Sequence, residues 1–157
     1  MPAVSVLRHA KAVTGFGLAD IDRPLADRGR RDALRAGERL RVIGPLPDLV
    51  LCSTAVRTRQ TLDGLALGDV RSVFEPAIYH NDVDVLLDLI RQTEDAVSTL
   101  LMIGHNPSFH QLVHDLTGEA PDAFPTCALA VVELPGPWTE TQPGTGRLAD
   151  FWTPKTS

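Results

Sequence analysis

The sequence lacks the features that mark several common classes of protein. Cys52 and Cys127 are its only cysteines, which is too few to indicate a disulfide framework or a zinc site. No apolar run approaches the roughly 20 residues of a membrane-spanning helix. The amino terminus shows no basic segment followed by an apolar stretch and a cleavage site, so we expect no signal peptide. These absences predict a reduced, cytoplasmic protein without a membrane partner.

Positive charge is also in short supply. The chain has 15 Lys and Arg against 20 Asp and Glu, a net charge of −5, whereas nucleic-acid-binding domains usually present a basic face. We therefore expect no nucleic-acid partner, and a protein of this charge that binds an anion must gather positive groups locally. With 157 residues, of which 43% are hydrophobic, the chain is predicted to form one domain over residues 1–157.

Short apolar runs that favour strands alternate along the chain with helical patterns. This alternation indicates an α/β fold with a mostly parallel central sheet and helices on both of its faces. The longest helical pattern, at 27–43, places Ala33, Ala36 and Leu40 on one side. The predicted strands lie at 4–7, 49–52, 70–74, 99–103, 128–134 and 147–151, and further helices follow residues 53, 82 and 106.

Polar residues at the predicted helix starts are candidates for N-caps, because their side chains can accept a hydrogen bond from a free amide of the first turn. A glycine close to the end of a helical pattern is a candidate for its C-terminus. The candidate caps are Ser53 or Thr54, Asp82 and Asn106, and the candidate terminator is Gly118.

Three of the predicted strands end in residues that suit phosphate chemistry. The first runs directly into Arg8 and His9, the second is followed by Arg57, and the fourth runs into His105. In open α/β sheets, ligands bind beyond the carboxyl ends of the strands. If these strands are parallel neighbours, two arginines and two histidines meet at one edge of the sheet. We predict a phosphate site that contains a nucleophile at this edge.

Each of these residue types has a role in such a site. The planar guanidinium of Arg8 or Arg57 can bind two phosphoryl oxygens at once. A histidine is largely neutral at cellular pH and can attack phosphorus, provided that a fixed acceptor holds its other ring nitrogen. We assign this nucleophilic role to His9 and expect His105 to hydrogen-bond a phosphoryl oxygen.

Four motifs, taken in order along the chain, resemble those of the histidine phosphatase (phosphoglycerate mutase-like) superfamily. The short length and the Arg23-Pro24-Leu25 segment make the chain most similar to the SixA-type phosphohistidine phosphatase branch. The motifs are Leu7-Arg8-His9-Ala10-Lys11, Arg23-Pro24-Leu25 with Gly29, the run from Ser53 to Thr61, and Gly104-His105-Asn106-Pro107.

The resemblance implies a three-layer α/β/α sandwich in which His9 is the nucleophile, Arg8 and Arg57 bind phosphate, and His105 completes the pocket. It implies a phosphatase that works through a covalent phosphohistidine on the enzyme, without a metal or another cofactor. The partner that it implies is a phosphorylated protein, such as a histidine-phosphotransfer-type domain, or a small phosphorylated substrate.

Two positions depart from the family pattern. Ala10 stands where the first motif most often has glycine, and we expect its methyl group to tighten the loop without touching the reacting atoms. Ala26 stands where the helix after Arg23-Pro24-Leu25 often begins with threonine, and it offers no capping oxygen. We expect Asp27 to act as the cap in its place.

No residue is an obvious general acid. Family members often supply a glutamate after the third strand, but Pro76 follows Glu75, and we interpret Glu75 as a solvated acid. Asp20 and Asp22, in the loop after the first motif, are the remaining candidates. A phosphohistidine needs less help than an alkyl phosphate, because its imidazole leaving group can carry its own proton. The absence of an obvious acid therefore favours a phosphohistidine or another activated substrate over a sugar phosphate, and we predict phosphohistidine on a protein as the substrate.

Other interpretations stay open. A cysteine-dependent phosphatase loop would need five residues between Cys52 and Arg57, and there are four. His110 and His114 have the i, i+4 spacing of metal ligands, but no third ligand is evident, so we interpret them as surface or boundary histidines. A small-molecule phosphomonoesterase of the same superfamily is the runner-up function, and a phosphoprotein-binding module without turnover is a third.

Overall fold

A six-stranded sheet, in the order β3-β2-β4-β1-β5-β6, lies at the centre of the computed structural model, which describes residues 2–15 and 17–156. Neighbours among the first four strands are parallel, and the two pairs that involve β5 are antiparallel. The strands are β1 (Ala3–Arg8), β2 (Leu49–Cys52), β3 (Arg71–Phe74), β4 (Thr99–Gly104), β5 (Leu129–Glu133) and β6 (Arg147–Trp152). The sheet is therefore mostly parallel, as the alternation of elements predicts.

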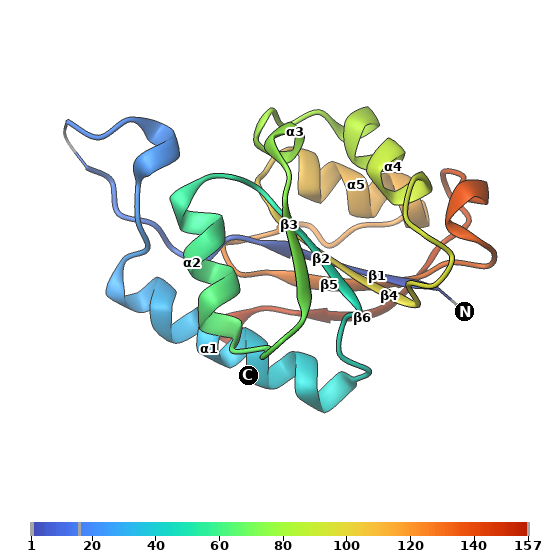
Figure 1. The fold of residues 1–157 in the computed structure, drawn as a ribbon, viewed down its shortest axis with the longest axis horizontal. Coiled ribbons are helices and arrows are strands. Elements are labelled where there is room, and N and C mark those ends of the chain that lie inside the picture. The colour runs from blue at the N-terminus through green and yellow to red at the C-terminus, as the bar shows by residue number, and fades with distance from the viewer. Residues whose placement is uncertain (1, 16, 157) are drawn as a thin grey trace.

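Helices cover both faces of the sheet, which makes three layers (Figure 1). One face carries α1 (Asp27–Ile43) and α2 (Val56–Leu65), and the other carries α3 (Pro76–Tyr79), α4 (Val83–Arg91) and α5 (Ser108–Thr117). Three short 3₁₀ helices complete the fold: η1 (Asp20–Asp22), η2 (Trp138–Glu140) and η3 (Pro154–Thr156). The α/β/α sandwich is confirmed.

The core consists of two apolar clusters, one on each face of the sheet. The cluster beneath α1 and α2 includes Ala33, Ala36, Leu40 and Leu65, so the helical stripe of α1 faces the sheet. The opposite cluster packs the apolar faces of α4 and α5 around Trp138. Central strands β2 and β4 are buried along their whole length, because helices cover both of their faces.

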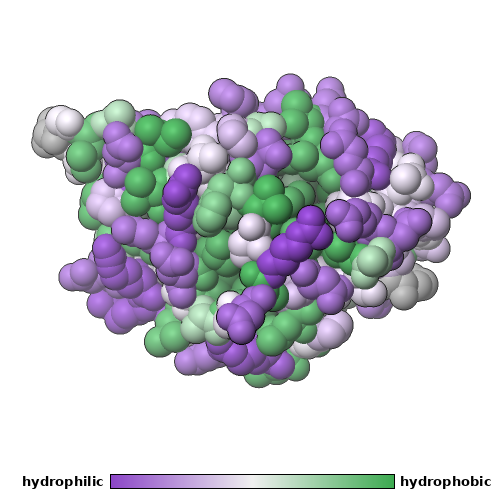
Figure 2. All heavy atoms as spheres, in the orientation of Figure 1, coloured by the Kyte–Doolittle hydropathy of each residue, from purple (hydrophilic) through white to green (hydrophobic). Residues whose placement is uncertain are grey.

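The edge strand β3 is exposed at all four of its residues. Val73 and Phe74 leave 37% and 43% of their surface in contact with solvent, and the Arg59 guanidinium lies 4.6 Å above the centre of the Phe74 ring. Figure 2 shows apolar side chains on the face of the molecule that β3 crosses. Arg59 therefore covers part of an edge that no further strand pairs with in the described residues.

The strand register brings the motifs to one edge of the sheet. Arg8 pairs with Gly104 across β1 and β4, and Cys52 pairs with Ile103 across β2 and β4. The residues that follow these pairs therefore emerge side by side at the carboxyl ends of the three strands. The prediction that these strands are parallel neighbours is confirmed.

Gly29 explains why a glycine follows the Arg23-Pro24-Leu25 segment. A Cβ atom at this position would lie 2.1 Å from the carbonyl oxygen of Lys11, far inside van der Waals contact. The Ala26 amide also donates a hydrogen bond to this carbonyl, at 2.9 Å. Only a residue without a side chain lets the start of α1 pack against the backbone that follows Arg8 and His9.

Two of the predicted helix boundaries are confirmed. The Asp82 carboxylate caps α4 by accepting a hydrogen bond from the Asp84 amide at 2.9 Å. Gly118 ends α5 with a φ of 74°, a left-handed conformation that glycine adopts without strain.

The caps predicted at Asp27, at Ser53 or Thr54 and at Asn106 are wrong. The N-caps of α1, α2 and α5 are Ala26, Ala55 and Pro107, and none of them makes a side-chain cap. Ser53 and Asn106 make other hydrogen bonds instead, to the His105 ring and to the Phe124 carbonyl. These two polar side chains support the strand-end site rather than the helices that follow them.

Among the described residues, no helix combines the length and the apolar character that crossing a bilayer would require.

Candidate active site

His9 is the first residue beyond β1, and its backbone is fixed on both sides. Its amide donates to the Gly104 carbonyl at 3.0 Å, and its carbonyl accepts from the Cys127 amide at 2.9 Å. The ring Nδ1 lies 2.7 Å from the Ala10 carbonyl oxygen. Because a carbonyl can only accept, Nδ1 carries the proton and Nε2 keeps a free lone pair.

Burial makes the His9 ring neutral. It lowers the pKa of His9 to about 3, and the charges of Arg57, Arg8 and His105 in its protonated form act in the same direction, whereas the hydrogen bond to Ala10 opposes them. His9 as a whole is only 7% exposed. At neutral pH, His9 is therefore an uncharged imidazole with a defined tautomer, which is the state that a nucleophile needs.

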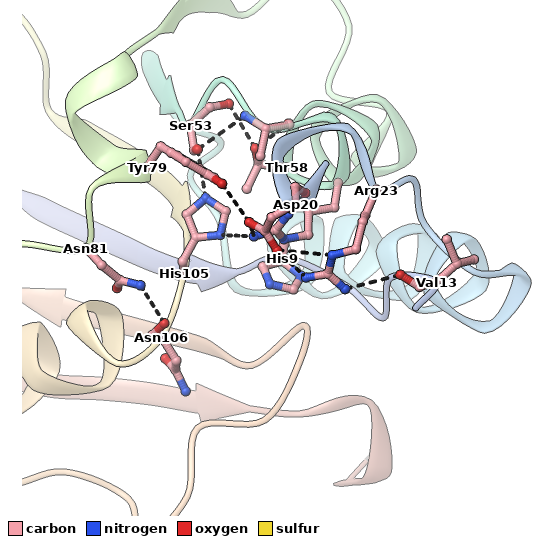
Figure 3. A network of polar contacts seen from close by, with 12 residues as sticks. His9, Val13, Asp20, Arg23, Ser53, Thr58, Tyr79, Asn81, His105 and Asn106 are labelled. Carbon is pink, nitrogen blue, oxygen red and sulfur yellow. Dashed lines mark hydrogen bonds and ion pairs between the residues drawn. The ribbon is translucent and has the colours of Figure 1, made fainter. Parts of the chain in front are cut away.

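His105 lies beside His9, with 5.4 Å between the ring centres (Figure 3). Its Nδ1 lies 3.4 Å from Nη2 of Arg57, which can only donate, so Nε2 carries the proton and donates to the Ser53 hydroxyl at 2.7 Å. Burial and then the charge of Arg57 lower the pKa of His105 to about 4. Both ring nitrogens of His105 are thus held by the segment that follows β2, the strand next to β4.

Two arginines supply the positive charge of the site. Arg57 is 5% exposed, and burial followed by the charge of Arg57 lowers the pKa of Arg8. Arg8 donates from Nη1 to the Phe124 carbonyl at 3.1 Å. The buried Nε atoms of both arginines have no hydrogen-bond partner in the described part of the chain. Two close guanidinium groups with unpaired donors are suited to bind an oxyanion.

Asp20, on the loop after β1, reaches this cluster. Its carboxylate contacts Nη2 of Arg57 at 3.1 Å, the Tyr79 hydroxyl at 2.6 Å and the Arg23 guanidinium at 3.0 Å (Figure 3). The hydrogen bond from Tyr79, followed by Arg57 and Arg23, holds the pKa of Asp20 well below its usual range, although partial burial acts against them. Asp20 is an ionised member of the site.

The other two acids considered from the sequence lie elsewhere. Asp22 is exposed, and within the described residues its side chain makes no hydrogen bond or ion pair with the site. The Glu75 carboxylate caps α3 by accepting from the Ala77 amide at 3.2 Å. The structure therefore brings Asp20, but not Asp22 or Glu75, into contact with the arginines.

Tyr79 is the residue of this site that sequence reasoning misses. It lies at the end of α3, and its ring packs edge-on against His105 with 5.5 Å between ring centres. Its hydroxyl hydrogen bond to Asp20 raises the pKa of Tyr79. As the only tyrosine in the sequence it could have been noticed, but no motif connects it with the strand ends.

The other two candidate sites from the sequence, at Cys52 and at the His110 and His114 pair, have no arrangement comparable to the strand-end site. Burial raises the pKa of Cys52 to about 12, so its thiol is not poised as a nucleophile. His110 hydrogen-bonds the Pro121 carbonyl and stacks on Phe124, and His114 is exposed. Across residues 2–15 and 17–156, no group of three His, Cys, Asp or Glu side chains is placed to hold a metal ion.

The two buried histidines predict a pH-dependent stability. Between their ordinary pKa of 6.5 and their folded values, the unfolded chain binds a proton at each ring and the folded protein does not, so stability falls as the pH drops. At pH 5 each histidine lowers the free energy of unfolding by about 2 kcal/mol relative to neutral pH.

Urea unfolding at pH 7 and pH 5 measures this loss. The double variant His9→Gln and His105→Gln is expected to lose much less stability between the two pH values than the wild type. The exposed His114→Gln variant should behave like the wild type. An equal loss in the double variant and the wild type would contradict the assignment.

A mostly parallel α/β/α sandwich with Arg8, His9, Arg57 and His105 at adjoining strand ends defines a phosphoglycerate mutase-like class of protein. No family model matches the chain. A solved structure from Agrobacterium tumefaciens, assigned as the phosphohistidine phosphatase SixA, is 31% identical with a TM-score of 0.84, over 98% of this chain and 99% of that one.

Two further proteins are similar to this chain. The protein histidine phosphatase SixA complexed with tungstate is 26% identical with a TM-score of 0.85, and 98% of each chain is covered. An uncharacterized protein of Mycobacterium tuberculosis is 36% identical over 159 residues, which cover 95% of this chain and 100% of that protein. The chain belongs to the SixA-type branch of the histidine phosphatase superfamily, and it is by that membership a phosphatase-type hydrolase.

Proposed function

We propose that this protein hydrolyses phosphohistidine on a protein substrate and that His9 carries the phosphoryl group between the two half-reactions. The state of His9 supports this most strongly. Its ring is buried and neutral, and the Ala10 carbonyl fixes the proton on Nδ1. Nε2 is left as the atom that attacks phosphorus, and the same hydrogen bond stabilises the ring when it becomes positive.

The arginines and His105 have distinct roles in this proposal. Arg8 and Arg57 bind the phosphoryl oxygens, whose charge a phosphoryl transfer site must stabilise, with donors that include their unpaired Nε atoms. A dianion in this position would also favour protonation of His105, which then adds a further positive charge. The tungstate bound by a structural neighbour is a tetrahedral oxyanion, and it supports an oxyanion site of this kind.

The chemistry of the leaving group supports phosphohistidine as the substrate. An imidazole that already carries a proton leaves without help, whereas an alkoxide must be protonated as it leaves. For a phosphate ester, the candidates for a general acid from the sequence are Asp20 and Asp22, and of these only Asp20 contacts the arginines. One structural neighbour is assigned as a phosphohistidine phosphatase and another is named a protein histidine phosphatase, which also supports this substrate.

We propose as partner a phosphorylated protein of the histidine-phosphotransfer type. The Asp20 side chain at the site is 54% exposed, so a side chain on another protein can reach this position. Both cysteines are free and buried, which is compatible with the cytoplasmic location that we propose.

Turnover of three substrates tests this function: a phosphohistidine peptide, an aryl phosphate and a sugar phosphate, without added metal. We expect the peptide to be hydrolysed with the highest kcat/KM and the sugar phosphate with the lowest. A higher kcat/KM for the sugar phosphate would identify a small-molecule phosphomonoesterase instead. Binding of the peptide without turnover of any substrate would identify a binding module.

A further inference from the structure

The Asp20 carboxylate is saturated with hydrogen bonds. Its Oδ1 accepts from Nε and Nη2 of Arg23, at 3.1 and 3.0 Å, and its Oδ2 accepts from Nη2 of Arg57 at 3.1 Å and from the Tyr79 hydroxyl at 2.6 Å. Its backbone carbonyl accepts from Nη1 of Arg57 at 2.7 Å. A carboxylate offers about four acceptor positions, and all of them are used here.

This arrangement is unsuited to a proton donor. The three side chains that donate these hydrogen bonds stabilise the charged form of Asp20, and two of them, Arg23 and Arg57, are cations. A protonated Asp20 would have to give up at least one of these contacts. The carboxylate therefore stays ionised, and it can accept a hydrogen bond from a bound molecule once one of its present donors is drawn away, whereas it is unsuited to supply a proton.

We propose that Asp20 determines the specificity of the site by accepting a hydrogen bond from the N–H group of the leaving imidazole, so that it favours phosphohistidine over phosphate esters. This inference rests on the proposed function. It gives Asp20 a role opposite to that of a general acid, because the charge that it stabilises is positive and the proton stays on the substrate.

Arg57 connects the phosphoryl group with this contact. Its Nη2 donates to Oδ2 of Asp20, and a phosphoryl oxygen bound by Arg57 competes for the same donor. Oδ2 then lacks the hydrogen bond from Arg57, and the imidazole N–H can donate to Oδ2 in its place. An ester has no N–H group at this position, and negative charge develops on its leaving oxygen close to the Asp20 carboxylate. The same carboxylate thus favours the departure of an imidazole and disfavours the departure of an ester oxygen.

The transfer needs no proton movement. The substrate ring starts as an imidazolium, protonated on the nitrogen remote from phosphorus. The lone pair of His9 Nε2 forms the new P–N bond, the P–N bond of the substrate breaks, and its electron pair returns to the substrate ring, which leaves as neutral imidazole. His9 becomes the phosphoimidazolium, with Nδ1–H still donated to Ala10.

Hydrolysis of the enzyme intermediate completes the cycle. A water oxygen attacks phosphorus, the P–N bond to His9 breaks, and its electron pair returns to Nε2. The proton released by the water goes to the solvent or to the departing phosphate. Asp20 has no part in this second step, so its effect is confined to the step that discriminates between substrates.

The variant Asp20→Asn tests this proposal, because it keeps the size of the side chain and removes its charge. We would measure kcat/KM for a phosphohistidine peptide and for p-nitrophenyl phosphate, whose leaving groups both depart without a proton from the enzyme. The ratio of the constant for the peptide to the constant for p-nitrophenyl phosphate reports the two effects of the carboxylate together: the N–H contact that favours the peptide and the repulsion that opposes the ester. Asp84→Asn, at an exposed aspartate on α4, is the matched control for the loss of one charge.

In Asp20→Asn we expect the ratio to fall by about tenfold or more, the range for a lost charge-assisted hydrogen bond. We also expect inorganic phosphate to inhibit this variant more strongly, because a negative charge beside Arg57 has been removed. Asp84→Asn should change neither quantity. Equal losses for both substrates, with unchanged inhibition by phosphate, would overturn the proposal and leave Asp20 a positioning role only.

The result for the wild type separates this inference from the proposed function. A wild-type protein that fails to hydrolyse the phosphohistidine peptide overturns the proposed function and the role of Asp20 together. A wild-type protein that hydrolyses it, with an unchanged ratio in Asp20→Asn, overturns the role of Asp20 alone.

Discussion

His9→Ala is expected to lose at least about 10⁴-fold in kcat/KM toward every substrate that the wild type turns over, because no other group can take the place of its Nε2. The ring is buried, and its Nδ1 is already committed to the Ala10 carbonyl. Arg8 and Arg57 remain in the variant, so inorganic phosphate should still bind. Activity against the phosphohistidine peptide and phosphate binding by calorimetry measure the two effects.

A control substitution at a second histidine distinguishes the loss of activity in His9→Ala from a general effect on folding. His114 is exposed on α5, and within the described residues no side-chain hydrogen bond or ion pair joins it to the strand-end site, so His114→Ala should keep the wild-type activity. Circular dichroism should show the same secondary structure in both variants. If His9→Ala kept more than about a hundredth of the wild-type activity, His9 could not be the nucleophile.

Arg57→Ala has the second largest expected effect. We expect its affinity for inorganic phosphate or tungstate to fall about a hundredfold or more, since each lost charge-assisted hydrogen bond contributes about 1.5–3 kcal/mol. Arg57→Lys should recover only part of this affinity, because an ammonium group lacks the planar fork of a guanidinium. Oxyanion binding followed by calorimetry, with kcat/KM measured beside it, gives both effects.

The pKa of His105 provides an independent test of the Arg57→Ala variant. Arg57 is the second largest cause of the lowered pKa of His105, so this pKa should rise in Arg57→Ala, as followed by NMR. Arg59→Ala is the control on the same helix, because Arg59 is exposed and lies over the Phe74 ring instead. An unchanged oxyanion affinity in Arg57→Ala would remove Arg57 from the site.

The fold and the centre of the site follow from the sequence for one physical reason. Strands β1, β2 and β4 are short apolar runs that must be buried, and parallel pairing places their carboxyl ends at the same edge of the sheet. Any residue that directly follows such a strand is therefore positioned by the sheet itself. This is why Arg8, His9 and His105 could be placed together before the structure was known.

The rest of the site depends on contacts that no local pattern encodes. Tyr79 reaches Asp20 across 59 positions from a helix of only four residues, and no periodicity predicts where such a short helix points. Ser53 is of a residue type that often caps helices, yet its hydroxyl forms a hydrogen bond with the His105 ring. Tertiary packing decides whether such a side chain caps a helix or hydrogen-bonds a distant residue, and the sequence alone does not show that packing.

The most direct test of the account is the site of phosphorylation in the enzyme during turnover of a phosphohistidine peptide. The reaction would be quenched in alkali, which preserves a phosphohistidine, and the modified residue located by mass spectrometry in the wild type and in His9→Ala. We predict one phosphoryl group on His9 of the wild type and none on the variant. A phosphoryl group on another residue, or turnover without any phosphorylated enzyme, would contradict the central claim that His9 is the nucleophile.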